Sequence, residues 1–119
     1  MRSKLEAEVC AILNDLGLAH AHTPRHFEVR LDGNRMAAYS PDIVVRGRGR
    51  EGKTVVFETL ESPRDPDVEK VAAFRKQYGQ EFYVIVVAHD DVLARIEEQC
   101  YDESSTPEAM QSFLGRMVD

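Results

Sequence analysis

Residues 82–88 form a near-continuous apolar run, FYVIVVA. A strand with one solvated face alternates apolar and polar side chains, so an unbroken run is typical of a strand that is covered on both faces. Just before it, a helical pattern begins at Asp65 or Pro66 and ends at Gly79. The sequence therefore predicts a helix that crosses over into a buried strand, as in an α/β sandwich.

The first sixty residues predict one helix followed by three strands. Ser3 and Glu6 have the spacing of a capping box, and Ser40-Pro41 is expected to interrupt the second strand, because proline cannot donate to a ladder. The predicted ranges are 3–16 for the helix and 26–31, 35–46 and 54–60 for the strands. Asp32-Gly33-Asn34 predicts a tight turn between the first two strands. A glycine-rich hairpin joins the second and third.

Two further helices are expected after the buried strand, at about residues 91–100 and from Thr106 onward. Residues 101–105 would be a linker between them. The complete order, αβββαβαα, predicts an α/β fold around a mixed central sheet, with two extra C-terminal helices. At 119 residues the chain is expected to form one domain over residues 1–119.

Composition narrows the class of protein. The apolar fraction of 43% is that of a globular protein, and no apolar run approaches the roughly 18 to 20 residues of a membrane span. A net charge of −6 argues against a mainly electrostatic nucleic-acid coat protein but not against a metal-dependent enzyme. Charges near the N-terminus oppose a signal peptide, so a cytoplasmic protein with reduced Cys10 and Cys100 is expected.

Two acids lie where strands carry otherwise apolar residues. Asp42 begins the run Ile-Val-Val, and Glu58 follows Val-Val-Phe inside the next strand. Hairpin pairing would bring Asp42 and Glu58 close together, and alternation would put Val56, Glu58 and Leu60 on one face. A buried carboxylate is costly unless it is paired or binds metal, and two carboxylates on adjacent strands suit Mg²⁺.

These features resemble the PD-(D/E)xK nuclease superfamily, which includes restriction endonucleases and archaeal Holliday-junction resolvases. The resemblance consists of Ser-Pro-Asp at residues 40–42, the glycine-rich hairpin, and Val-Val-Phe-Glu-Thr-Leu at residues 55–60. It covers about residues 3–88 and implies a restriction-endonuclease-like αβββαβ core. It also implies that Asp42 and Glu58 are catalytic and bind Mg²⁺ or Mn²⁺.

The resemblance implies a further carboxylate on the first helix and a lysine two residues after the strand glutamate. Glu6 fits the helix pattern, with Glu8 as the alternative, although a capping box explains Glu6 equally well. The lysine position holds Leu60, which can neither donate a proton nor stabilise negative charge. Lys70 on the second helix would replace the catalytic lysine; otherwise it is a surface lysine that pairs with Asp67 or nearby acids.

Two other groups of residues have open interpretations. A basic run is either a solvated hairpin tip or a set of nucleic-acid phosphate contacts; its members are Arg46, Arg48, Arg50 and Lys53. His20 and His22 flank Ala21, but such a pair needs further ligands to bind metal, and the sequence shows none nearby.

Three functions are compatible with this pattern. The first is a metal-dependent DNA endonuclease that hydrolyses phosphodiester bonds as a homodimer, acting on duplex or branched DNA through its structure rather than its sequence. The second is a catalytically inactive module of the same fold that binds nucleic acid or protein, which Leu60 and the acidic charge favour. The third is a small homodimeric interaction protein in which Asp42 and Glu58 are structural acids.

Overall fold

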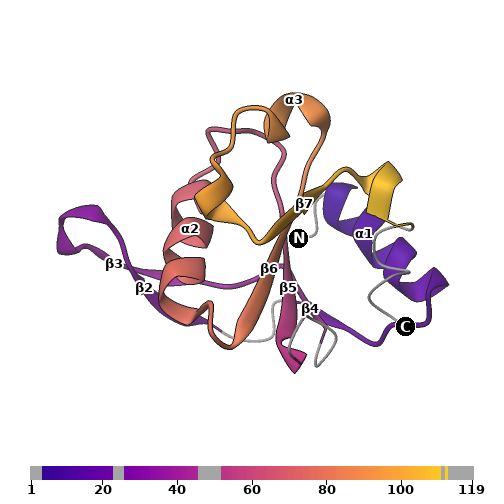
Figure 1. Ribbon diagram of the computed structural model, residues 1–119, viewed down its shortest axis with the longest axis horizontal. Coiled ribbons are helices and arrows are strands. Elements are labelled where there is room, and N and C mark those ends of the chain that lie inside the picture. Colours follow the sequence, from indigo (N-terminus) through magenta and orange to yellow (C-terminus); the bar gives the residue numbers. More distant parts are fainter. Residues whose placement is uncertain (1–3, 23–25, 46–51, 111, 113–119) are drawn as a thin grey trace.

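The computed structural model describes residues 4–22, 26–45, 52–110 and 112. Within these residues, five strands form a central sheet (Figure 1). In spatial order they are β1 (Ala21–His22), β4 (Ile43–Val45), β5 (Thr54–Thr59), β6 (Phe82–Val87) and β7 (Glu103–Ser105). β4 is antiparallel to β1 and β5, whereas β5, β6 and β7 are parallel. The predicted α/β fold with a mixed sheet is confirmed.

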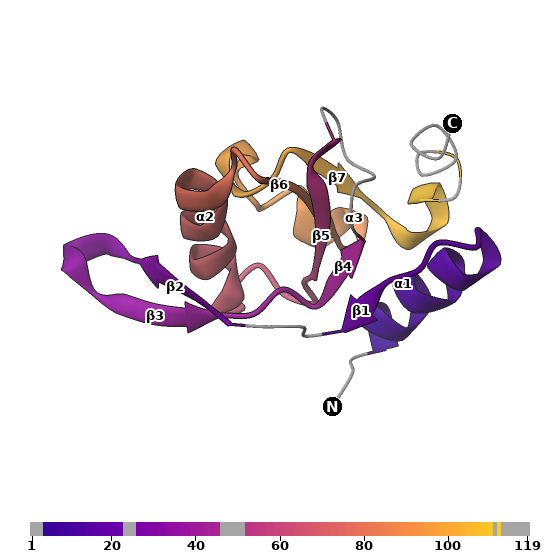
Figure 2. The ribbon, with the colours of Figure 1, turned by 90° about the horizontal axis from the view of Figure 1, so that it is seen from below.

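Helices cover both faces of this sheet. α1 (Lys4–Asp15) lies on one side and α2 (Asp67–Tyr78) on the other, as Figure 2 shows. Val55 and Phe57 of β5 pack with the α1 core, whereas Val56 packs with the α2 core. β6 is buried along almost its whole length, which explains its unbroken apolar sequence.

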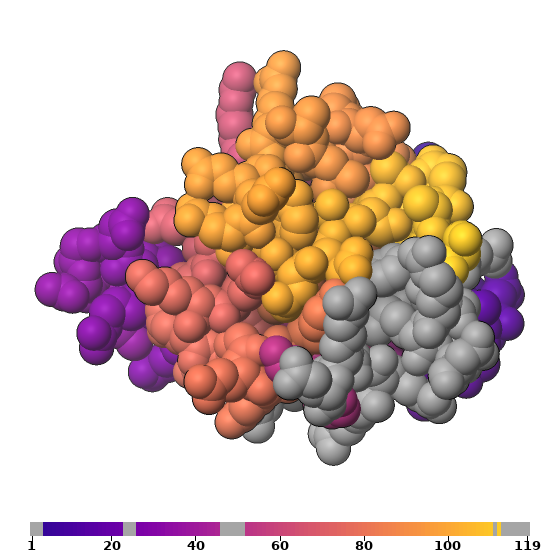
Figure 3. Space-filling view, viewed as in Figure 1, coloured from indigo at the N-terminus to yellow at the C-terminus, as the bar shows by residue number. Residues whose placement is uncertain are grey.

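The first predicted hairpin is divided between two sheets. β2 (Phe27–Arg30) and β3 (Met36–Tyr39) form a two-stranded sheet of their own around the 3₁₀ turn η1 (Asp32–Asn34). The chain then re-enters the central sheet as β4, after the expected interruption at Ser40-Pro41. The outer part of the hairpin projects beside α2 as a lobe at the left of Figures 1 and 3.

The C-terminal third differs from its prediction. The helix expected at residues 91–100 is replaced by the short α3 (Asp90–Leu93) and the 3₁₀ turn η3 (Glu98–Cys100). The expected linker contains β7, because the Asp102 carboxylate accepts the backbone N–H of Val84 at 2.8 Å and so holds this segment against β6. Residues 107–110 are helical, as expected. No helix in the described ranges is long and apolar enough to span a bilayer.

Candidate functional site

The β4–β5 ladder brings the two strand acids together. Ile43 lies opposite Phe57 and Val45 lies opposite Val55. One step beyond the last pair of this ladder, the same register places Asp42 opposite Glu58. Pairing of adjacent antiparallel strands is therefore what creates a carboxyl pair at this end of the sheet.

Glu58 is a buried acid with one defined donor. Its side chain is only 1% exposed and lies on the α2 side, where the Tyr39 hydroxyl donates to Oε1 at 2.5 Å. Burial raises the pKa of the Glu58 carboxyl well above its ordinary value, and the negative charge of Asp42 raises it further. The Tyr39 hydrogen bond acts in the opposite direction. Glu58 is therefore a carboxyl that tends to keep its proton.

Asp42 is oriented by Thr59. Its Oδ2 accepts both the backbone N–H and the Oγ1 hydroxyl of Thr59, each at 2.9 Å. Burial raises the pKa of Asp42, whereas the two Thr59 donors lower it. A hydrogen bond between the two carboxyls lowers the pKa of Asp42 and raises that of Glu58, as when Glu58 keeps the proton and donates it to Asp42. The pair therefore shares one proton where a cation could bind.

Glu6 joins this cluster from α1. It is buried, and its Oε2 lies 2.7 Å from Nδ1 of His22 on β1. Its negative charge also raises the pKa of Asp42. The structure thus brings Glu6, Asp42 and Glu58 into one electrostatic cluster, whereas Glu8 is a half-buried residue of the same helix. The capping partner expected for Glu6, Ser3, lies outside the described residues.

Leu60 and Lys70 are the two residues that bear on the catalytic lysine that the resemblance implies. Leu60 is 0% exposed and packs in the α2 core with Val71. Lys70 is half-buried, and its positive charge lowers the pKa of Asp67. The Asp67 charge in turn raises the pKa of Glu58. Hence the α2 charge that acts on Glu58 is a negative one.

The predicted phosphate-binding run is only partly described. Its three arginines, Arg46, Arg48 and Arg50, lie outside the described residues. Nζ of Lys53 donates to the carbonyl of Gly79 at 3.0 Å and so occupies one of the acceptors at the C-terminal end of α2. Lys53 therefore has a structural contact at the end of α2, and its predicted contact with nucleic-acid phosphate stays a prediction.

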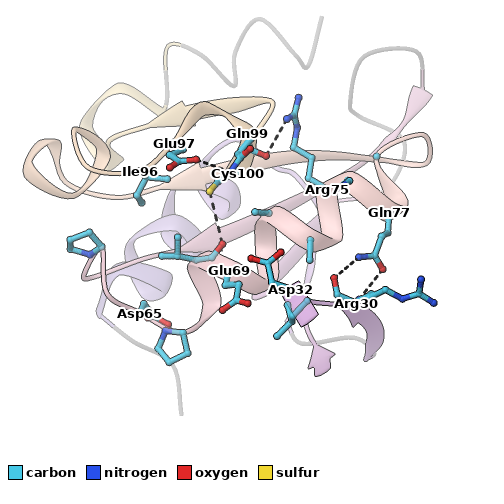
Figure 4. Close-up of a pocket in the computed structure, with 18 of the residues that line it drawn as sticks. Arg30, Asp32, Asp65, Glu69, Arg75, Gln77, Ile96, Glu97, Gln99 and Cys100 are labelled. Carbon is cyan, nitrogen blue, oxygen red and sulfur yellow. Dashed lines mark hydrogen bonds between the residues drawn. The ribbon is translucent and has the colours of Figure 1, made fainter. Parts of the chain in front are cut away.

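A broad groove follows the outer surface of α2, between the β2–β3 lobe and the η3 segment (Figure 4). Arg30 and Gln77 close one side through two hydrogen bonds. The backbone N–H of Arg30 donates to Oε1 of Gln77 at 3.0 Å, and Nε2 of Gln77 donates to the backbone carbonyl of Arg30 at 2.9 Å. Acidic and basic side chains are mixed along it. Neither Asp42 nor Glu58 lines this groove, so it is separate from the carboxyl pair.

Sequence reasoning missed Tyr39 and Thr59, the residues that orient the two acids. Tyr39 is the last residue of β3 and is 2% exposed, and its hydroxyl needs an acceptor there. The sequence did contain a signal for Tyr39. If side chains alternate between the two faces of β3, this tyrosine, three residues before Asp42, points toward the core. The Thr59 contact carries no such signal, since Asp42 lies at a bend before β4 that the strand pattern does not specify.

Comparisons with known proteins bear on the fold. No protein-family model matches the chain, and no curated protein matches it at a significant level. Among solved structures, the chain is similar to protein VC1899 from Vibrio cholerae, with a TM-score of 0.50 and 15% sequence identity. The match covers 96% of this chain and 31% of that chain, so this chain spans about a third of that protein's length. At this identity the likeness shows a shared fold, and function has to be argued from the site.

Proposed function

We propose that this chain is a metal-dependent DNA endonuclease of the PD-(D/E)xK type, in which Asp42 and Glu58 bind Mg²⁺ or Mn²⁺. The observation that carries the proposal is the pairing of the buried Glu58 carboxyl with the half-buried Asp42 carboxyl, both of which have raised pKa values. Two adjacent carboxyls, one of them fully buried, destabilise the fold at neutral pH, because one of them must retain a proton. A divalent cation that replaces the proton relieves this cost.

The neighbours of the pair support this assignment. Tyr39 and Thr59 each donate to one carboxyl, so the orientation of both acids is fixed before a cation arrives. Glu6 contributes a third carboxylate close enough to act on Asp42, as expected of a supporting metal ligand on the first helix. Such an oxygen-only set suits Mg²⁺, which would supply a bound water of lowered pKa and positive charge against the phosphate.

The proposed substrate rests on the charge of these 119 residues. With a net charge of −6, they offer little basic surface with which to read a base sequence. We therefore propose that a homodimer acts on duplex or branched DNA by its structure, with the cation as the main contact to the scissile phosphate. Lys70 is the candidate for the missing lysine, and it would have to turn from Asp67 toward the carboxyl pair.

A second function is favoured by one specific observation. Leu60 is fully buried and Glu58 is 1% exposed, so the position that should carry a catalytic lysine is part of the α2 core. A protein of this fold that has lost catalysis could keep such a site as a packing feature and bind nucleic acid or protein through another surface.

A cleavage assay separates the two functions. Supercoiled, branched and single-stranded DNA are incubated with the protein and Mg²⁺ or Mn²⁺, and Asp42→Asn is compared with Asp91→Asn, an exposed acid on α3. The endonuclease proposal expects metal-dependent cleavage that Asp42→Asn abolishes and Asp91→Asn retains. Lys70→Ala should lower the rate if this lysine assists. Cleavage that survives Asp42→Asn would refute the assigned site, and binding without cleavage would favour the inactive module.

A further inference from the structure

A second cluster of metal-binding side chains lies between α1 and β1. Cys10, His20 and His22 each offer a ligand atom, and these atoms all lie within 4.8 Å of one another. His20 and His22 are two residues apart at the start of the sheet, and Cys10 is one helical turn after Glu6 on α1. The cluster therefore joins two elements that are distant in sequence, which is why the histidine pair alone gave no third ligand.

Hydrogen bonds indicate which nitrogen of each histidine carries the hydrogen. Nδ1 of His20 lies 3.0 Å from the Leu18 carbonyl, and a carbonyl can only accept, so Nδ1 carries the hydrogen. Nδ1 of His22 lies 2.7 Å from the Glu6 carboxylate and donates to it in the same way. In the neutral imidazole, Nε2 of each ring is then the lone-pair nitrogen. Metal-binding histidines are typically oriented by such a carbonyl or carboxylate partner.

The spacing fits a tetrahedral ion. Cys10 Sγ lies 3.3 Å from Nε2 of His20. Bonds of about 2.3 Å to sulfur and about 2.0 to 2.1 Å to nitrogen place ligand atoms roughly 3.5 Å apart around zinc. The widest separation in the cluster, up to 4.8 Å, needs a small side-chain rotation to close. The three residues are half-buried, so a metal there would keep a position open to solvent.

We propose that Cys10, His20 and His22 form a zinc site, with Glu6 as the carboxylate partner of His22. One thiolate and two imidazoles are the ligands that zinc prefers, and Mg²⁺ does not use them. The ion fixes α1 against β1, a two-residue strand at the edge of the sheet. Water completes the coordination. This site is distinct in ligand chemistry from the oxygen site at Asp42 and Glu58.

The two sites are linked through one residue. Glu6 accepts from His22 and also acts electrostatically on Asp42. Zinc bound to His22 strengthens the donor character of Nδ1 and so holds Glu6 in place. Occupancy of the zinc site therefore determines how firmly the third carboxylate faces the proposed Mg²⁺ site.

Cobalt titration tests the site directly. Reduced protein freed of metal by a chelator is titrated with Co²⁺, and we expect a thiolate-to-cobalt charge-transfer band that saturates at one equivalent and disappears when Zn²⁺ is added. Cys10→Ser should abolish the band, and Cys100→Ser, at the other cysteine, should leave it unchanged. A chromophoric chelator competing for zinc gives the affinity, which His20→Gln or Glu6→Gln should lower about 10-fold or more.

Three results would overturn the zinc site: no charge-transfer band in the wild type, a band that persists in Cys10→Ser, or unchanged zinc affinity in His20→Gln. Because Cys10→Ser could affect folding, circular dichroism is recorded for each variant, and His20→Gln with its control His89→Gln provides the same test away from the helix. His89 is exposed at the end of β6. Asp42→Asn is a further control and should keep the cobalt band, because Asp42 is not a member of the Cys10 cluster.

Discussion

Removing the Tyr39 hydroxyl tests whether Glu58 is held by a single donor. Tyr39→Phe keeps the aromatic ring, which packs 5.0 Å from the Phe74 ring between centroids, and deletes only the group that donates to Glu58. Leaving a buried acceptor without its donor costs about 1 to 3 kcal/mol of folding free energy. For a domain of this size, each kcal/mol lowers the melting temperature by roughly 3 to 6 °C.

The effect of this substitution should grow with pH. The Tyr39 bond lowers the pKa of Glu58, so its loss raises that pKa further above the unfolded value. A carboxyl with a raised pKa in the folded state contributes full stability below its unfolded pKa and loses it as pH rises toward the folded pKa. Tyr39 itself stays protonated across this range, because burial and Glu58 raise its own pKa well above the ordinary value. The cost of Tyr39→Phe should therefore be larger at about pH 8 than at about pH 4.

Urea unfolding at these two pH values measures the difference, with Tyr78→Phe as a matched control. Tyr78 also donates its hydroxyl, at 2.9 Å to the Glu28 carbonyl, but in an exposed position. Its loss should change stability by less than about 0.5 kcal/mol. A double-mutant cycle with Glu58→Gln then isolates the pair. If Tyr39→Phe costs no more than Tyr78→Phe at either pH, the hydroxyl is not what satisfies Glu58.

Three further predictions concern the site and its support. Leu60→Ala should cost about 2 to 5 kcal/mol in urea unfolding, because the side chain is fully buried. Mn²⁺ binding by calorimetry should release protons and tighten as pH rises, because the cation displaces the shared proton, and Asp42→Asn should weaken this binding by removing one of the two ligands. Asp102→Ala should cost about 1 to 3 kcal/mol, since it leaves the buried N–H of Val84 without its acceptor and removes the 3.0 Å ion pair with Arg75. An unchanged melting temperature would contradict the role given to β7.

Local periodicity was sufficient to predict the sandwich. The unbroken apolar run of β6 and the alternation along β5 each depend on side-chain direction alone, so both could be read from the sequence. The approach of Asp42 to Glu58 followed from the same logic, because a hairpin with alternating faces leaves few registers. The α2 crossover was likewise specified by its terminal residues, with Pro66 before the first turn and Gly79 at the end.

Features that depend on contacts distant in sequence could not be predicted in this way. Residues 91–100 have apolar side chains at helical spacing, yet Val92, Ile96 and Cys100 reach the α2 core from a short helix and a 3₁₀ turn. β7 forms because the Asp102 carboxylate pairs with β6, and nothing local in the sequence indicates a strand there. Cys10 could not be predicted as the third ligand of the histidine pair for the same reason, since it lies on α1 rather than beside β1 in the sequence.

Leucine rather than lysine at position 60 affects the charge around the carboxyl pair. A lysine at this position would point to the same face as Glu58 and supply a positive charge that lowers its pKa. Leu60 is instead part of the α2 core, and the α2 charge that raises the pKa of Glu58 is the negative one of Asp67. Either a proton or a bound cation must then neutralise the pair. Leu60 offers no group for general-base catalysis, and the proposed cation is the partner that would neutralise the pair at a pH where the proton is lost.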